Sequence, residues 1–115
     1  MLLTKDLNDK VRERIQQSAP FRREYLREGL HCVITGDVET GKSVLRDYIN
    51  GTLGFVALGK ALSRDPKTLM RMLSPKGNPT IRNFFEIVTY LQKIERFKLE
   101  VVESQPAKSS ARRAA

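Results

Sequence analysis

The sequence predicts an all-α fold, a compact helical bundle that contains a helix-turn-helix and ends in a short β-strand. Two observations predict the helices. Apolar residues recur at helical spacing over most of the 115 residues, and residues that favour helix starts precede the apolar runs. A third observation predicts the strand: only Phe97–Val102 alternates apolar and polar side chains. With 40% hydrophobic and 30% charged residues, the composition is that of a globular chain with one modest core.

The first third of the chain predicts two helices. One apolar stripe runs along residues 6–17 and consists of Leu7, Val11 and Ile15. Ser18 can cap the next helix and Pro20 suits its first turn, since proline lacks an amide that the first turn would leave unpaired. The apolar period then continues to Gly36. We assign residues 1–36 to an N-terminal helical extension.

Shorter helices follow. Asp37 can cap a third helix, which the Asn50–Gly51 pair would end. Two short helices are expected near residues 54–62 and 66–73, and a longer one begins at Thr80. We assign residues 37–102 to the core that holds these helices and the strand. Residues 103–115 are small, polar and basic, and we expect a disordered tail there.

The charge of the chain is concentrated in one zone. The net charge is +8. Residues 63–82 carry a single acid, Asp65, against five bases, namely Arg64, Lys67, Arg71, Lys76 and Arg82. A zone of this kind between nearly neutral neighbours is typical of a surface that binds a polyanion. The alternative is an ordinary solvated face, because lysine and arginine cover many surfaces.

Several other classes of protein are disfavoured. The chain has one cysteine, Cys32, and one histidine, His31, which excludes an internal disulfide and multi-cysteine metal clusters. Because neighbouring residues on a helix point in different directions, this pair is not a catalytic dyad. We therefore expect no enzyme activity, no metal and no cofactor. No uncharged stretch approaches the ~20 residues of a membrane span, so we expect a cytoplasmic protein without a membrane partner.

One motif is typical of a different class, the nucleotide-binding proteins. Residues 36–43 (GDVETGKS) match the phosphate-loop pattern, in which backbone amides hold phosphates and the lysine reaches the terminal ones. The surrounding sequence does not support that function, because no parallel sheet and no metal-holding acid on a later strand are predicted. We expect instead that Gly36 ends one helix, Asp37 caps the next and Gly41 allows another helix to approach. On this interpretation Lys42→Ala leaves function intact.

Residues 54–73 predict the helix-turn-helix. Two short helices are joined by Ser63, Arg64 and Asp65, and Gly59 is small enough to let them pack closely. Four side chains share one polar face of the second helix and its turn, namely Arg64, Lys67, Thr68 and Arg71. Such a face suits the major groove of DNA, where arginine pairs with guanine. We expect Lys76, Asn78, Thr80 and Arg82 of the following loop and helix start to contact phosphates.

A family resemblance points the same way. Residues 25–102 resemble the addiction-module antidote proteins, the helix-turn-helix antitoxins of bacterial type II toxin–antitoxin pairs, which are related to phage-repressor-type regulators. Three stretches carry the resemblance: 36–42 (GDVETGK), 44–50 (VLRDYIN) and above all 67–80 (KTLMRMLSPKGNPT). Ser63 departs from the family, which usually has glycine there. The resemblance implies a cytoplasmic, nucleoid-associated DNA-binding regulator whose recognition helix is 66–73 and which typically dimerises.

These arguments converge on a sequence-specific, antitoxin-type autorepressor that binds double-stranded DNA. We expect a two-fold homodimer in which the strand at 97–102 or the last helix meets its mate, because a lone strand leaves its backbone groups unpaired. Two alternatives remain open. The helices could serve only to bind and neutralise a partner toxin, or the chain could be a phosphate-loop nucleotide-binding protein. The sequence names neither the operator nor a cognate toxin.

Overall fold

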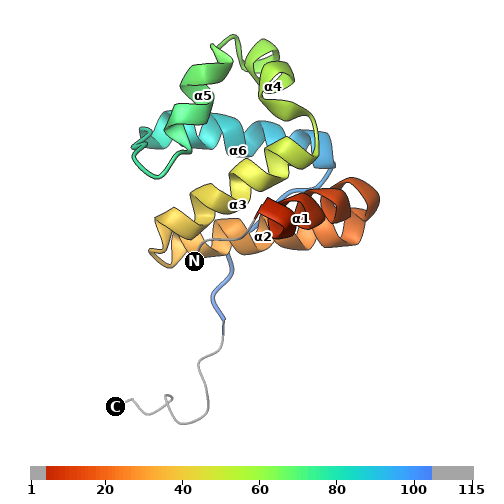
Figure 1. Cartoon of the computed structure of the whole chain (residues 1–115). Helices are drawn as coiled ribbons and strands as arrows, with labels where there is room; N and C mark the ends of the chain where they lie inside the picture. The colour runs from red at the N-terminus through yellow and green to blue at the C-terminus, as the bar shows by residue number, and fades with distance from the viewer. Residues whose placement is uncertain (1–4, 105–115) are drawn as a thin grey trace, which may run out of the picture.

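The computed structural model describes residues 5–104, with side chains from Asn8 onward. These residues contain six helices, arranged as in Figure 1. They are α1 (Lys5–Gln17), α2 (Ala19–Ile34), α3 (Val38–Gly51), α4 (Gly54–Leu62), α5 (Pro66–Met72) and α6 (Ile81–Glu95). The all-helical prediction is therefore confirmed for the described residues.

Four helices begin where the sequence predicts, because a side chain accepts a hydrogen bond from an orphan amide of the first turn. The distances from donor nitrogen to acceptor oxygen lie between 3.1 and 3.2 Å. The capping residues are Ser18 for α2, Asp37 for α3, Asp65 for α5 and Thr80 for α6. Local chemistry thus fixes the starts of α5 and α6, which carry most of the basic residues singled out in the sequence.

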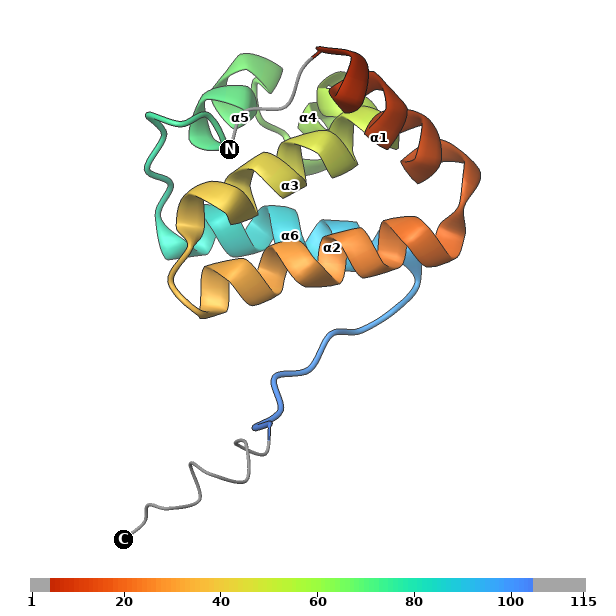
Figure 2. The same ribbon diagram turned by 60° about the horizontal axis from the view of Figure 1, so that its bottom comes forward.

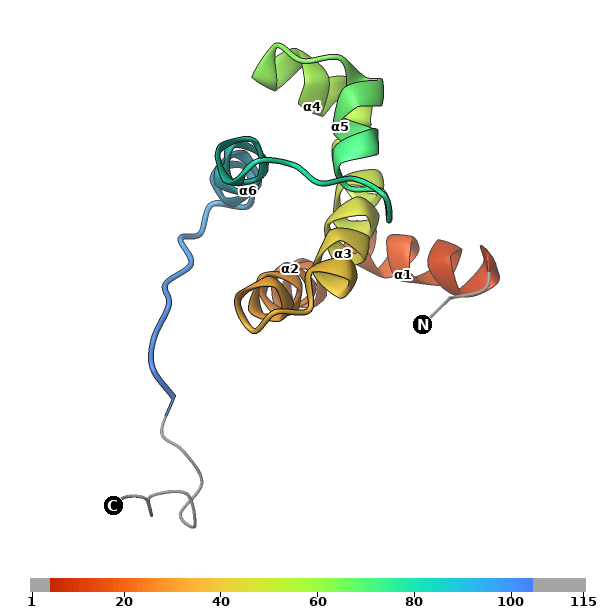
Figure 3. The same cartoon turned by 90° about the vertical axis from the view of Figure 1, so that its left-hand side faces the viewer.

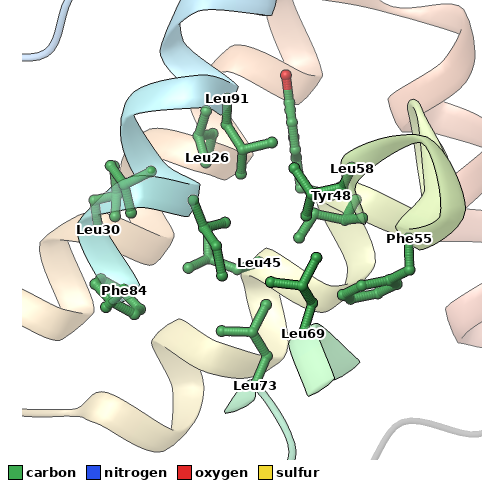
Figure 4. Close-up of a cluster of buried hydrophobic side chains, with 13 residues drawn as sticks. Leu26, Leu30, Leu45, Tyr48, Phe55, Leu58, Leu69, Leu73, Phe84 and Leu91 are labelled. Carbon is green, nitrogen blue, oxygen red and sulfur yellow. The ribbon is translucent and has the colours of Figure 1, made fainter. Parts of the chain in front are cut away.

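One hydrophobic core joins α2 through α6 (Figure 4). Each of these helices buries at least one apolar side chain in it, and α1 covers Gly51 of α3 with Ile15. The core residues are Leu26, Leu30, Leu45, Tyr48, Ile49, Phe55, Leu58, Leu69, Leu73, Phe84, Ile87, Val88 and Leu91. Since α2 supplies two of them, it packs as part of the same core as residues 37–102.

Helices α2 and α3 cross at glycines. A Cβ at Gly29 would lie 2.5 Å from Cγ1 of Val44, and one at Gly41 would collide with Val33 and lie 3.0 Å from the carbonyl oxygen of Gly29. The two backbones can approach this closely only because neither glycine carries a side chain. This confirms the packing role predicted for Gly41.

A single carboxylate ties α6 to both α2 and α3. Glu95 is 6% exposed and accepts hydrogen bonds from Arg22 Nε (3.0 Å) and Arg23 Nε (3.2 Å) of α2. The hydroxyl of Tyr48 on α3 donates to the same carboxylate, and the pKa of Tyr48 is raised by burial and by this bond. Two guanidinium groups offset the cost of burying the charge. We name these four residues the Glu95 cluster.

The chain leaves the bundle after α6. Arg96 ends the helix in the left-handed conformation (φ 62°). Phe97 and Leu99 still pack against the core, and the chain beyond them leads away from the helices (Figures 1 and 2). Leu99 is held by its amide, which donates to Gln92 Oε1 at 2.7 Å. Residues 97–104 have no regular secondary structure in this single chain. The strand that the alternating pattern predicts at Phe97–Val102 therefore stays a prediction. The tail predicted over 103–115 lies, from Gln105 on, outside the described residues.

Candidate nucleic-acid interface

Helices α4 and α5 form a tight helix-turn-helix at one end of the molecule (Figure 1). Ser63 ends α4 in the left-handed conformation (φ 56°), and the amide of Arg64 donates to Gly59 O at 2.9 Å. A Cβ at Gly59 would lie 2.6 Å from Arg64 O and 3.1 Å from the Pro66 ring. The predicted packing reason for Gly59 is therefore confirmed, and the turn holds α5 at a fixed angle to α4.

Helix α5 buries one side and exposes a basic one. Leu69 is fully buried, Thr68 is half-buried, and Lys67, Met70 and Arg71 are exposed. The side chains of Lys67 and Arg71 lie one turn apart on the same surface. This is the arrangement that the sequence predicts for a recognition helix.

Arg64 differs from the other predicted contacts because its guanidinium is engaged within the chain. Its Nε donates to Glu86 at 2.8 Å and its Nη2 to Asn83 Oδ1 at 2.9 Å, both on α6. The hydrogen bond from Arg64 lowers the pKa of Glu86. Arg64 thus connects the turn to α6, and any contact with DNA would have to compete with Glu86.

The loop between α5 and α6 presents the remaining predicted residues. Lys76, Asn78, Thr80 and Arg82 are all exposed. Thr80 Oγ1 accepts from Asn83 N at 3.1 Å, and the first turn of α6 contains no acidic residue. The amino end of α6 therefore combines unpaired amides, a positive helix-dipole end and Arg82, which is a favourable environment for a phosphate.

Two cations of α3 position this loop, and sequence analysis did not identify either. Lys42 is 2% exposed, and its Nζ donates to Gly77 O at 2.7 Å and to Pro75 O at 3.5 Å. One turn later, Arg46 Nη1 donates to Leu73 O at the carboxyl end of α5. Both cations satisfy carbonyls that a helix end and loop leave unpaired. The i, i+4 spacing of Lys42 and Arg46 shows that the two side chains share one face of a helix. The sequence does not indicate which loop that face contacts.

Gly77 allows the loop to lie against the end of α5. A Cβ at this position would collide with the carbonyl oxygens of Arg71 and Met72. The amide of Gly77 also donates to Ser74 O at 2.9 Å, which closes the turn. Consequently Arg71 on α5 and Lys76 in the loop keep a fixed spacing.

The phosphate-loop match does not form a phosphate loop. Gly36 lies in a turn (φ 103°), Asp37 caps α3 and residues 38–43 are helical. The amine of Lys42, which would reach phosphates, instead bonds the 75–77 loop and pairs with Glu39 Oε2 at 3.1 Å. The expectation that Lys42→Ala is harmless overlooked this role of the side chain in positioning the loop.

The described residues offer little for other chemistry. No group of three or more His, Cys, Asp and Glu residues among them could hold a metal ion. The pKa of Cys32 is raised, first by desolvation and then by Glu28 and Asp37, which disfavours a reactive thiolate. Of the helices described, none combines the length and apolar character needed to span a bilayer.

No known protein family, curated protein or solved structure matches the chain. The resemblance to addiction-module antidote proteins therefore stays a prediction, carried by the three sequence stretches and compatible with the helical arrangement described above.

Proposed function

We propose that the protein is a sequence-specific double-stranded-DNA-binding regulator, acting as an antitoxin-type autorepressor in the cytoplasm. The observation that carries the proposal is the exposed basic face of α5, presented by a tight helix-turn-helix with a second basic, amide-rich element beside it. Base-reading side chains and phosphate-binding groups occur in this combination in helix-turn-helix proteins.

Each exposed residue has a role in this proposal. Arg71 and Lys67 enter the major groove, where the fork of Arg71 suits the O6 and N7 atoms of guanine, and Thr68 contacts a base or phosphate. Phosphates on either side are bound by Lys76, Asn78, Thr80 and Arg82. Arg64 holds the turn against α6. Lys42 and Arg46 keep the phosphate-binding loop in register with α5.

The principal alternative is a module that neutralises a toxin without specific DNA binding. It would use the same helices, so the overall fold does not separate the two. The charge of this surface favours DNA, because four exposed cations lie on α5 and on the loop and helix start beside it, namely Lys67, Arg71, Lys76 and Arg82. A polyanion would neutralise them together.

Binding to DNA tests the proposal directly. The protein is first used to enrich fragments from a library of its own genome and from random duplexes, and the upstream region of its own gene is assayed against a scrambled duplex. Fluorescence anisotropy at several salt concentrations then compares wild type with Arg71→Ala and Lys76→Ala. Lys93→Ala serves as control, because Lys93 is an exposed cation at the other end of α6 from Arg82.

We expect the two variants to weaken DNA binding in different ways. Loss of the base contact in Arg71→Ala should cost about 1–3 kcal/mol on the preferred site, roughly 5- to 150-fold in Kd, with little change on random DNA. Lys76→Ala should weaken binding to all duplexes and reduce the salt slope by about one. The absence of any enriched sequence, or an Arg71→Ala variant that binds the preferred site like wild type, would contradict the proposal.

A further inference from the structure

The exposed face of α5 contains an apolar side chain to which the proposed function gives no role. Three residues of this helix are exposed, namely Lys67, Met70 and Arg71, and Met70 is 49% exposed. At 3.6 residues per turn, Met70 lies about 60° from Lys67, on the side away from Arg71. Lys67 therefore stands between a thioether and a guanidinium side chain on one continuous surface.

The other large apolar side chains of this region are turned into the protein. Leu69 and Leu73 are fully buried, and Met72 is half-buried and packs against the core. Among the described residues, neither Lys67 nor Arg71 forms an ion pair, so both charges are available to an external polyanion. A ligand that approached these two cations would also meet Met70.

Helix α5 is placed where a large ligand can reach it. Helices α4 and α5 lie at the end of the molecule away from α2, and the segment after α6 leads away from that end (Figure 3). The face of α5 opposite Leu69 is thus left uncovered by the described part of the chain.

The major groove of DNA contains one kind of apolar group that would match Met70. Base edges present hydrogen-bond donors and acceptors there, and thymine adds its C5-methyl group. A thioether makes only weak hydrogen bonds, so the polar base edges and the phosphates would not compensate the loss of water around it. Methionine is also flexible and polarisable, which suits contact with a small apolar group of variable position.

We propose that Met70 is a specificity-determining residue that contacts the methyl group of a thymine. This inference rests on the proposed DNA-binding function, and it adds a second base to the guanine assigned to Arg71. Because Met70 and Arg71 are consecutive residues of one short helix, the thymine lies within about two base pairs of that guanine.

Replacement of thymine by uracil tests this contact, since uracil lacks only the C5-methyl group. The full-length protein enriches a preferred duplex from a random library copied by polymerase, which contains no methylated cytosine. Each thymine is then replaced in turn, and fluorescence anisotropy gives the Kd. We expect uracil to weaken binding about fourfold at one thymine close to the guanine that Arg71 reads, which is the contribution of one buried methyl group.

Variants of the side chain show whether Met70 is the partner of that methyl group. Met70→Ala should lose the uracil penalty, because alanine is too short to reach the base, and its helix should be intact because alanine favours helix. Met70→Leu should keep the penalty, since leucine is apolar and of similar volume. Val101→Ala is the control, because Val101 is an exposed apolar residue outside the helix-turn-helix, and it should bind both duplexes like wild type.

The outcomes separate this inference from the proposed function. If no sequence is preferred, or if Arg71→Ala leaves the preference unchanged, the proposed function is wrong and this inference is wrong with it. If a preferred duplex is found but no uracil replacement weakens binding of wild type, only the inference about Met70 is overturned. A uracil penalty that persists in Met70→Ala overturns it in the same way.

Discussion

Lys42 makes a contact whose loss should destabilise the loop of the candidate interface. Its amine lies inside the protein and donates to Gly77 O at 2.7 Å, which holds the loop between α5 and α6 against α3. Lys42→Met keeps a side chain of similar length while removing the charge and the donor. The variant therefore isolates the hydrogen bond from the packing of the alkyl chain.

The size of the effect follows from the two shorter contacts of the amine, with Gly77 O and with Glu39. A hydrogen bond from a charged donor contributes about 1.5–3 kcal/mol, and its removal leaves Gly77 O without a donor from the protein. The second partner, Glu39, is 65% exposed, and an ion pair of that kind contributes about 0–1 kcal/mol. We expect Lys42→Met to lower the free energy of unfolding by about 1.5–3 kcal/mol and Glu39→Ala by less than about 1 kcal/mol.

Urea denaturation followed by circular dichroism measures both changes. With a slope of about 1–3 kcal/mol per molar urea, the midpoint for Lys42→Met should fall by about 1 M, while that for Glu39→Ala barely moves. A Lys42→Met midpoint within error of wild type would refute the argument. An equal loss in the two variants would also refute it, because the stabilisation would then come from the ion pair and not from the loop carbonyl.

Two further predictions concern local features. Ser63→Gly should raise the free energy of unfolding by about 0.5–1 kcal/mol, because a left-handed residue other than glycine is strained and the gain exceeds the entropy that glycine adds to the unfolded chain; a lower urea midpoint would contradict this. The pKa of Asp37 is lowered by hydrogen bonds from Thr40, so its stabilisation is complete above the ordinary value of 3.8 and is lost as the pH falls through the lower folded-state value. Asp37→Asn keeps the cap oxygen without titrating, so urea midpoints measured from neutral pH to below 3.8 should fall less steeply in the variant than in wild type, and parallel curves would argue against the cap as the cause.

The starts of the helices were predictable because capping is local. A residue such as Asp37 or Thr80 bonds an amide two or three positions later, so one short stretch of sequence contains both partners. The exposed face of α5 was predictable for the same reason, since helical spacing alone separates Leu69 from Lys67 and Arg71. The predicted boundaries of the helices accordingly lie within about a residue of those in the structure.

The long-range polar contacts were not predictable. Arg22 and Glu95 are 73 residues apart, and Lys42 and Gly77 are 35 apart. Helical spacing shows which face of a helix is apolar, but not which other helix will lie against a given cation. Arg64 illustrates the difficulty. Its spacing with Lys67 and Arg71 predicts that the three side chains share one exposed face, but in the structure Arg64 bonds Glu86 of the neighbouring α6.

The Glu95 cluster has a consequence for how the protein opens. The last turn of a helix ordinarily frays on its own, since few contacts hold it. Here the last residue of α6 is bound to two arginines of α2 and to Tyr48 of α3, so this turn cannot separate without disturbing three helices at once. We therefore expect the end of α6 to unfold together with α2 and α3 as part of one cooperative unit.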